Sequence, residues 1–257
     1  MDNSTNQNNY LIIQTAFLGD VVLSLSMAEY IKSQDSKSKV VFLTTKAGSP
    51  IAEECEFIDK VISYDKRGKD RGIRGIIKIS KRLNEFDFTA VFTPHRSFRS
   101  SILTKLIKSR SKYGFDKNSI SWLFSDLVKY CADKHEIVRN LSLVRAYWKD
   151  NSDEIIKPKL NKNGLKNDYV IMAPGSVWNT KRLPKEKWVE LILHPYMLDR
   201  KVILIGAKGD IQTAEAILKR VDGKHPSLVN RTGQDDIKQT IEVIAQGRLL
   251  ISNDSAP

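Results

Sequence analysis

Short apolar runs rich in β-branched residues alternate along the chain with segments of helical periodicity. The apolar runs cover residues 10–16, 39–45, 60–64 and 89–94, and then 168–176, 201–207 and 248–254. Runs that are apolar throughout are typical of parallel strands buried on both faces by helices. The pattern therefore predicts an α/β fold, with the strands in two groups that form two doubly wound, Rossmann-like sheets.

The two groups of strands are separated by a polar segment. Residues 148–168 are rich in Asn, Asp, Lys and Pro, which is the composition of a linker. We therefore expect an N-terminal domain of residues 1–160 and a C-terminal domain of residues 161–257. The sequence ends at "NDSAP", directly after the last predicted strand, where a doubly wound domain normally continues. We expect the second domain to be incomplete.

Composition excludes several classes of protein. A hydrophobic content of 41% in 257 residues is enough to fill a core, so disorder is not expected. The polar first nine residues do not form a signal peptide, and no apolar run approaches the roughly 18 residues that a membrane span needs. Cys55 and Cys131 have no metal-ligand spacing, and as free thiols they suit a reducing cytoplasm.

Positive charge is concentrated in two stretches of the first half. The net charge is +12, and residues 66–85 and 96–117 each contribute a net +6. Such stretches favour nucleic acid, anionic lipid head groups or phosphorylated glycans, or they form well-solvated helix faces. Aromatic residues are not interleaved with the charges as a base-stacking surface requires, so nucleic acid is disfavoured as a partner.

The first strand is followed by "FLGDVVLS", which places Asp20 between a strand and a helix. Ligands of parallel sheets bind outside the carboxyl ends of the strands, so Asp20 is a candidate catalytic residue. Asp is also a preferred residue at helix N-caps. Taken alone, the residue indicates a cap at least as well as a catalytic group.

The second half has three polar strand ends. Residues 173–192 combine Gly175, Ser176 and Lys181 just before a helix that Pro184 opens, which suits a phosphate site or an ordinary basic loop. Asp210 follows the next strand, where a carboxylate can hold a ribose diol or cap a helix.

The last predicted strand ends in "SNDSAP". Its Asn253, Asp254 and Ser255 can bind sugar hydroxyls or a diphosphate, or form an Asx turn.

Four segments, in this order, resemble glycosyltransferase family nine, the ADP-heptose:lipopolysaccharide heptosyltransferases. They are residues 18–32, 94–115, 173–192 with 204–210, and 230–257. The resemblance covers essentially the whole chain. It implies a GT-B fold of two Rossmann-like domains that face a cleft, with the acceptor bound by the first domain and the nucleotide-sugar by the second.

The resemblance also implies the chemistry and the residues that carry it. The reaction inverts the anomeric centre and uses neither a metal nor another cofactor, with an ADP-sugar as donor and Asp20 as general base. Lys181 would neutralise the donor diphosphate, and Arg96 and Arg99 would face anionic groups of the acceptor. The donor-binding set implied by the matching motifs is Ser176, Thr180, Lys181, Asp210, Asp254 and Ser255.

We therefore expect transfer of a heptose or a related sugar to a lipopolysaccharide core or another anionic glycolipid. The enzyme would be cytoplasmic, peripheral at the inner face of the inner membrane. The alternative is a truncated, inactive family member that binds nucleotide or glycolipid. A dinucleotide-dependent oxidoreductase is a weaker alternative, because no Gly-x-Gly-x-x-Gly follows any predicted strand.

Overall fold

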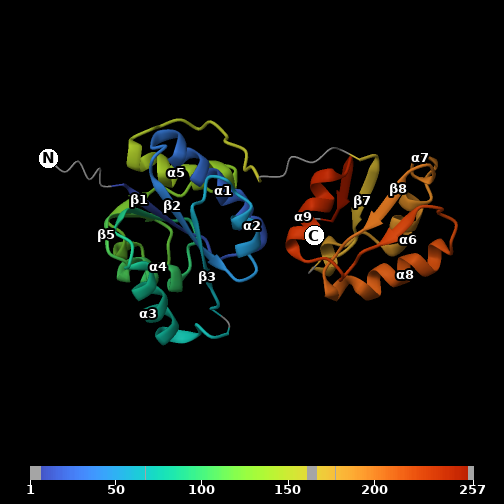
Figure 1. Cartoon of the computed structure of the whole chain (residues 1–257), viewed down its shortest axis with the longest axis horizontal. Helices are drawn as coiled ribbons and strands as arrows, with labels where there is room; N and C mark the ends of the chain where they lie inside the picture. The colour runs from blue at the N-terminus through green and yellow to red at the C-terminus, as the bar shows by residue number, and fades with distance from the viewer. Residues whose placement is uncertain (1–6, 67, 161–166, 177, 254–257) are drawn as a thin grey trace. The chain divides into compact units, whose positions relative to one another are not determined.

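A computed structural model describes residues 7–66, 68–160, 167–176 and 178–253. The chain divides into two compact units, Met1–Asn161 and Lys162–Pro257, each with its own sheet (Figure 1). Within the described ranges, no helix has the length and apolar character that crossing a bilayer requires.

The first unit is built on a six-stranded parallel sheet in the order β3-β2-β1-β4-β5-β6. Its strands are β1 (Asn9–Ile13), β2 (Lys39–Thr45), β3 (Lys60–Tyr64), β4 (Phe88–Thr93), β5 (Ser109–Phe115) and β6 (Asp126–Val128). The chain moves outward from β1 to β3 and then returns to place β4 on the other side of β1. The seam between β1 and β4 is therefore the topological switch point of this sheet, where ligands of open parallel sheets bind.

Helices cover both faces of this sheet. They are α1 (Leu18–Gln34), α2 (Ser49–Glu53), α3 (Gly72–Leu83), α4 (Phe98–Leu106) and α5 (Glu136–Trp148). Helices α1 and α5 pack together over one face, and α3 and α4 pack together over the other (Figure 1). Leu11 and Ile13 of β1 are buried under α3 and α4, in one cluster with Ile76 and Leu103. The central strands are largely apolar because both of their faces are covered by helices.

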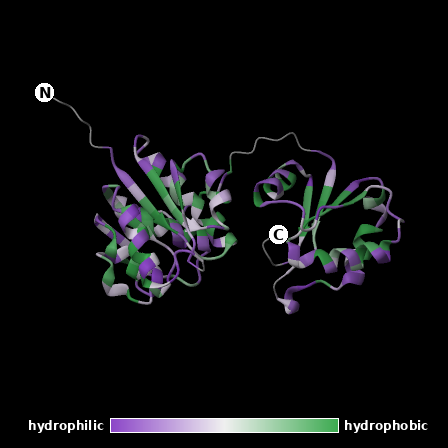
Figure 2. Ribbon diagram, turned by 60° about the horizontal axis from the view of Figure 1, so that its bottom comes forward, coloured by the Kyte–Doolittle hydropathy of each residue, from purple (hydrophilic) through white to green (hydrophobic). Residues whose placement is uncertain are grey.

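The second unit holds a four-stranded parallel sheet in the order β10-β7-β8-β9. Its strands are β7 (Tyr169–Ala173), β8 (Lys201–Leu204), β9 (Leu228–Asn230) and β10 (Leu249–Ser252). Its helices are α6 (Lys185–Ile192), α7 (Pro195–Leu198), α8 (Ile211–Val221) and α9 (Ile237–Gln246). In both units the strands are largely hydrophobic, whereas the helices alternate hydrophobic and hydrophilic residues (Figure 2).

Helices lie on both faces of the second sheet as well. Trp188 of α6 and Ile217 of α8 form one buried cluster with the strands, and Val243 of α9 belongs to a second cluster that also contains strand residues. The chain returns from β9 to place β10 beside β7, so the switch point of this sheet lies between β7 and β10.

The predicted α/β architecture is confirmed, and every predicted strand is present. The structure adds three strands that the apolar pattern did not predict, β5, β6 and β9. Strand β5 reads "SRSKYGF" and has no continuous apolar run. Strands β6 and β9 have only three residues each, which is too short for a periodicity to appear.

Candidate active site

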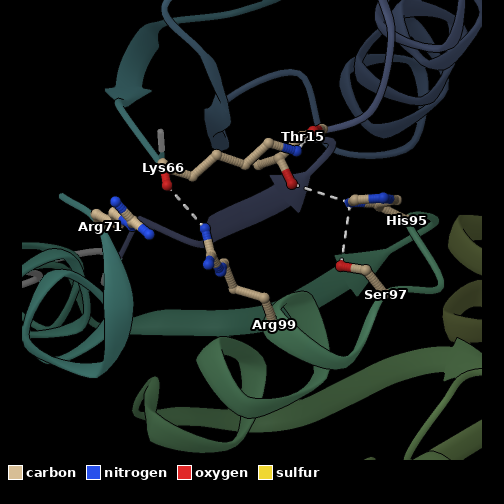
Figure 3. Close-up of a pocket in the computed structure, with 6 residues that line it drawn as sticks. All are labelled: Thr15, Lys66, Arg71, His95, Ser97 and Arg99. Atoms are coloured by element: carbon tan, nitrogen blue, oxygen red, sulfur yellow. Dashed lines mark hydrogen bonds between the residues drawn. The ribbon is translucent and has the colours of Figure 1, made fainter. Parts of the chain in front are cut away.

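Two polar side chains join the carboxyl ends of β1 and β4. Thr15 lies two residues beyond β1 and His95 two residues beyond β4. The Oγ1 of Thr15 lies 2.9 Å from the Nδ1 of His95 (Figure 3). The switch point of the first sheet is thus lined by a hydrogen bond between residues 80 positions apart in the sequence.

The imidazole of His95 is held by the start of α4. Its Nδ1 lies 3.0 Å from the Oγ of Ser100 and 3.4 Å from the Oγ of Ser97, the N-cap residue of the helix. Burial, with the positive charges of Lys66 and Arg96, lowers the pKa of His95 to about 4. The imidazole is therefore neutral at physiological pH, because burial and nearby cations both disfavour its charged form.

A basic cavity opens beside His95 (Figure 3). Its volume is about 560 Å³, and it is lined by Thr15, Lys66, Arg71, His95, Ser97 and Arg99. Lys66 Nζ donates to the carbonyl of Thr15 at 2.5 Å, and Arg99 Nη1 donates to the carbonyl of Lys66 at 2.9 Å. None of the described lining residues is acidic. Three cationic side chains and two hydroxyls suit an anionic group such as a phosphate or a carboxylate.

Asp20 lies in the first turn of α1 rather than at its N-cap. The helix begins at Leu18, Phe17 is the N-cap residue, and the Asp20 carboxylate reaches back to accept the N–H of Phe17 at 3.1 Å. The expected capping function is present, but from the third helical position, because Phe17 has no side-chain oxygen of its own. Burial raises the pKa of Asp20, and the carboxylate of Glu136 raises it further, against the effect of the hydrogen bond from Phe17.

Asp20 lines a second cavity of about 360 Å³ on the same edge of the sheet. The residues around it are Gln14, Ala16, Phe17, Asp20, Pro94, His95, Arg96, Ser97, Tyr130 and Glu136. The guanidinium of Arg96 stacks over the ring of Tyr130, 4.0 Å from its centroid. Arg96 therefore lies with Asp20, whereas Arg99 lines the basic cavity, and His95 lines both.

In the second unit, the loop after β7 holds the predicted phosphate-binding residues. Ser176 is buried, its Oγ accepts the N–H of Trp178, and its carbonyl accepts the Nε of Arg182 at 2.8 Å. Thr180 and Lys181 lie in a short 3-10 turn, Asn179–Lys181, and are exposed. Pro184, expected inside the first turn of the following helix, is its N-cap residue, and α6 begins at Lys185.

Asn253, one residue beyond β10, ties this loop to the sheet. Its Oδ1 accepts the N–H of Leu183 at 3.0 Å, and its Nδ2 donates to the carbonyls of Pro174 at 2.8 Å and Gly175 at 3.2 Å. The predicted donor-binding residues Asp254 and Ser255 lie outside the described residues.

Asp210 lies against the same loop. Its Oδ2 accepts the N–H of Ala207 at 2.9 Å, which is the helix-capping arrangement that the sequence left open. A Cβ on Gly175 would lie 2.3 Å from the Asp210 carboxyl carbon, so only glycine allows this approach. The structure thus places Asp210 against Gly175, the residue before Ser176, beyond the carboxyl end of β7.

Sequence reasoning missed several residues of the first site, among them His95, Lys66, Arg71 and Tyr130. The rule that singled out Asp20, a polar residue just after a strand, applies equally to His95. Lys66 and Arg71 were recognised only as part of a basic stretch, because nothing in that stretch distinguishes the residues that line a cavity from those that face solvent.

Comparison with known proteins identifies the family. Residues 76–257 match the model of glycosyltransferase family 9 (heptosyltransferase). The lipooligosaccharide heptosyltransferase 2 of Haemophilus ducreyi is 25% identical over 269 residues, which cover 95% of this chain and 77% of the relative.

Two solved structures share the fold. A family 9 glycosyltransferase from Veillonella parvula has a TM-score of 0.85 at 17% identity, covering 96% of this chain and 75% of that chain. The E. coli ADP-heptose lipopolysaccharide heptosyltransferase II has a TM-score of 0.82 at 17% identity, covering 96% and 79%. These similarities confirm the predicted α/β fold of GT-B type with Rossmann-like units. The family model matches most of the chain, and the chain therefore belongs to glycosyltransferase family 9, the heptosyltransferase family.

Proposed function

We propose that this chain is an inverting heptosyltransferase that transfers a heptose from an ADP-sugar to the core of a lipopolysaccharide or a related glycolipid. Family membership supports the reaction class. Similar proteins are named for lipooligosaccharide heptosyl transfer and for ADP-heptose, which supports the two substrates. The observation that carries the proposal is the position of Asp20, a carboxylate of raised pKa that lines a cavity at the switch point of the first sheet.

In this mechanism Asp20 is the general base. It removes the proton of the acceptor hydroxyl while that oxygen attacks the anomeric carbon of the donor sugar. The bond from the anomeric carbon to the diphosphate oxygen breaks on the opposite face, so ADP leaves and the configuration inverts. Burial helps Asp20 in this role, because a raised pKa makes the carboxylate a stronger base.

The donor is assigned to the second unit, and its diphosphate to the loop after β7. Lys181 would offset the negative charge that develops on the leaving diphosphate, with Thr180 and Ser176 as nearby hydroxyl groups. A lysine in this role allows transfer without a metal or another cofactor. Asp210 is assigned to the adenosine ribose, and the resemblance assigns Asp254 to the hydroxyls of the transferred sugar and includes Ser255 among the donor-binding residues.

The acceptor is assigned to the first unit. The basic cavity of Lys66, Arg71 and Arg99 would hold a phosphate or carboxylate of the glycolipid, beside the cavity that Asp20 lines. Arg96, stacked on Tyr130, would contact the acceptor next to the base. An acceptor of this kind places the enzyme in the cytoplasm, at the inner face of the inner membrane.

The test is Asp20→Asn, assayed for transfer from ADP-heptose to a panel of core-truncated lipopolysaccharides. Asn keeps an oxygen for the N–H of Phe17 but cannot take a proton. We therefore expect the transfer rate to fall by about 10²–10⁴-fold, with the affinity for ADP unchanged in calorimetry. The matched control is Asp236→Asn, which alters another helix-capping aspartate, at the start of α9.

Full transfer activity in Asp20→Asn would remove the base assignment. A wild-type chain that binds ADP but transfers no sugar to any acceptor of the panel would instead favour the nucleotide-binding alternative.

A further inference from the structure

Helix α3 has an apolar edge that no described part of the first unit covers. Its inner side packs Ile76, Ile79 and Leu83 into the core under the sheet. Its outer side exposes Ile73 and Ile77, which are 75% and 43% accessible. Residues four apart lie on the same face of a helix, so the two side chains form one apolar strip.

A basic band runs beside this strip. Arg74, Lys78, Lys81 and Arg82 are exposed on the same helix, and the helix contains no acidic residue. A helix turns by about 100° per residue, so going around its circumference from Ile73 and Ile77 one meets first Lys81 and Arg74. Lys78 and Arg82 come next. Lys78 also forms an ion pair of 3.2 Å with Asp70. The outer face of α3 thus combines an apolar strip with several cationic side chains.

The apolar strip begins close in sequence to the basic cavity. Arg71, the N-cap residue of α3, lines that cavity, and Ile73 lies two residues further along. Helix α4 packs against α3, and its first residue, Phe98, is 60% exposed beside Arg99, which lines the same cavity. Both helices start at the carboxyl edge of the sheet because each follows a parallel strand. Ile73 and Phe98 therefore lie within two residues of Arg71 and Arg99, which line the basic cavity.

The chemistry of this surface favours a bilayer over other partners. A helix that only faces water does not need two exposed isoleucines one turn apart. A second copy of the chain would bring two basic bands together, and like charges repel. A surface with cationic side chains beside an apolar strip is complementary to anionic lipid, where the cations meet head groups and the apolar side chains enter the acyl boundary.

We propose that the outer face of α3 docks the protein on an anionic bilayer, with Ile73 and Ile77 entering the head-group layer and Arg74, Lys78 and Lys81 contacting lipid phosphates. Only the role of docking, which is to bring the basic cavity to a lipid-borne acceptor, rests on the proposed function. The docking surface itself follows from the exposure and the charge of α3.

The experiment is cosedimentation of the full chain with phosphatidylcholine vesicles that do or do not contain phosphatidylglycerol. We expect binding only to the anionic vesicles, weakening as salt is raised. Ile73→Ser/Ile77→Ser and Lys78→Glu/Lys81→Glu should each lower the partition coefficient by about tenfold or more. Matched controls are Ile155→Ser, another exposed isoleucine of the same unit, and Lys37→Glu, which lies just before β2 at the amino edge of the sheet.

Several outcomes would overturn the proposal. These are failure of the wild-type chain to bind anionic vesicles, equal binding to both kinds of vesicle, and wild-type binding by both double variants. A further outcome would assign the strip to a second copy of the chain. The wild type would then be a dimer in size-exclusion chromatography and would not bind vesicles, and Ile73→Ser/Ile77→Ser would be a monomer. Circular dichroism confirms that the variants fold.

The docking test and the test of the proposed function give separate results. Vesicle binding requires no transfer, and Asp20→Asn should retain it. Conversely, the Ile73→Ser/Ile77→Ser variant should keep its rate on a water-soluble, delipidated core oligosaccharide and lose rate only on acceptor embedded in vesicles. Equal loss of rate on both acceptors would contradict docking as the role of α3.

Discussion

The neutral state of His95 makes the stability of the first unit dependent on pH. Its pKa is lowered from 6.5 to about 4 in the folded chain. Between these values the unfolded chain binds a proton that the folded chain excludes. The stability is therefore fully present above the unfolded pKa of 6.5 and falls as the pH drops toward 4.

The magnitude follows from the size of the shift. One pKa unit corresponds to about 1.4 kcal/mol, so the whole shift costs about 3 kcal/mol below pH 4. At pH 5.5, one unit below the unfolded pKa, the loss is already about 1.4 kcal/mol. A loss of that size is a large fraction of the stability of an ordinary domain.

Two measurements check this expectation. An NMR titration, with the His95 signal assigned by comparison with His95→Gln, should give an imidazole pKa near 4. Urea unfolding near pH 7.5 and near pH 5.5 should show the wild type losing about 1.4 kcal/mol more than His95→Gln. The carboxylates are the same in the two chains, so their contribution to the pH dependence drops out of the difference. A titration midpoint near 6.5, or equal pH dependence in the two chains, would refute the reasoning.

Two further substitutions test the packing and the loop anchor. Gly114→Ala would place a Cβ 2.5 Å from the ring of Phe124, so urea unfolding should show a loss of about 1–3 kcal/mol. Gly209→Ala is its control, because the new Cβ would meet no described atom within 4 Å apart from those of its own turn and its chain neighbours. Asn253→Ala removes three hydrogen bonds to the loop after β7, so ADP affinity in calorimetry should fall severalfold, whereas exposed Asn151→Ala should not change it. Wild-type affinity in Asn253→Ala would show that the loop holds its shape without the anchor.

The sequence predicts those parts of the fold that a buried, apolar backbone segment determines. Strand β2 was predicted at its observed bounds, Lys39–Thr45. Strand β5 was missed because Arg110 and Lys112 lie on one face, and on the other face the buried Phe115 is preceded by the polar Ser109 and Ser111. A strand near the edge of a sheet needs only one apolar face, and its short alternation resembles that of a polar loop.

In the site, a residue could be predicted where the elements that position it are adjacent in sequence. Asp20 was found because a strand and a helix adjacent in sequence define its position. The contact between Thr15 and His95 was not found, because it depends on β4 lying beside β1, and no local pattern encodes the order of strands in a sheet. A local rule also suggested Asp20 as an N-cap residue, because the residue before a helix usually provides the capping oxygen. In the structure Phe17 takes that position, and Asp20 caps the helix from its first turn.

The tie between Asn253 and the loop after β7 has a consequence for synthesis on the ribosome. The carbonyl of Pro174 leaves the ribosome 79 residues before the side chain that anchors it. At a synthesis rate of about 5–20 residues per second, Asn253 is made roughly 4–16 s after Pro174. Until β10 has paired with β7, the segment assigned to the diphosphate lacks the three hydrogen bonds that Asn253 supplies. The nascent chain therefore completes the anchor of the loop after β7 only when Asn253 has been made, long after the residues of the first unit have left the ribosome.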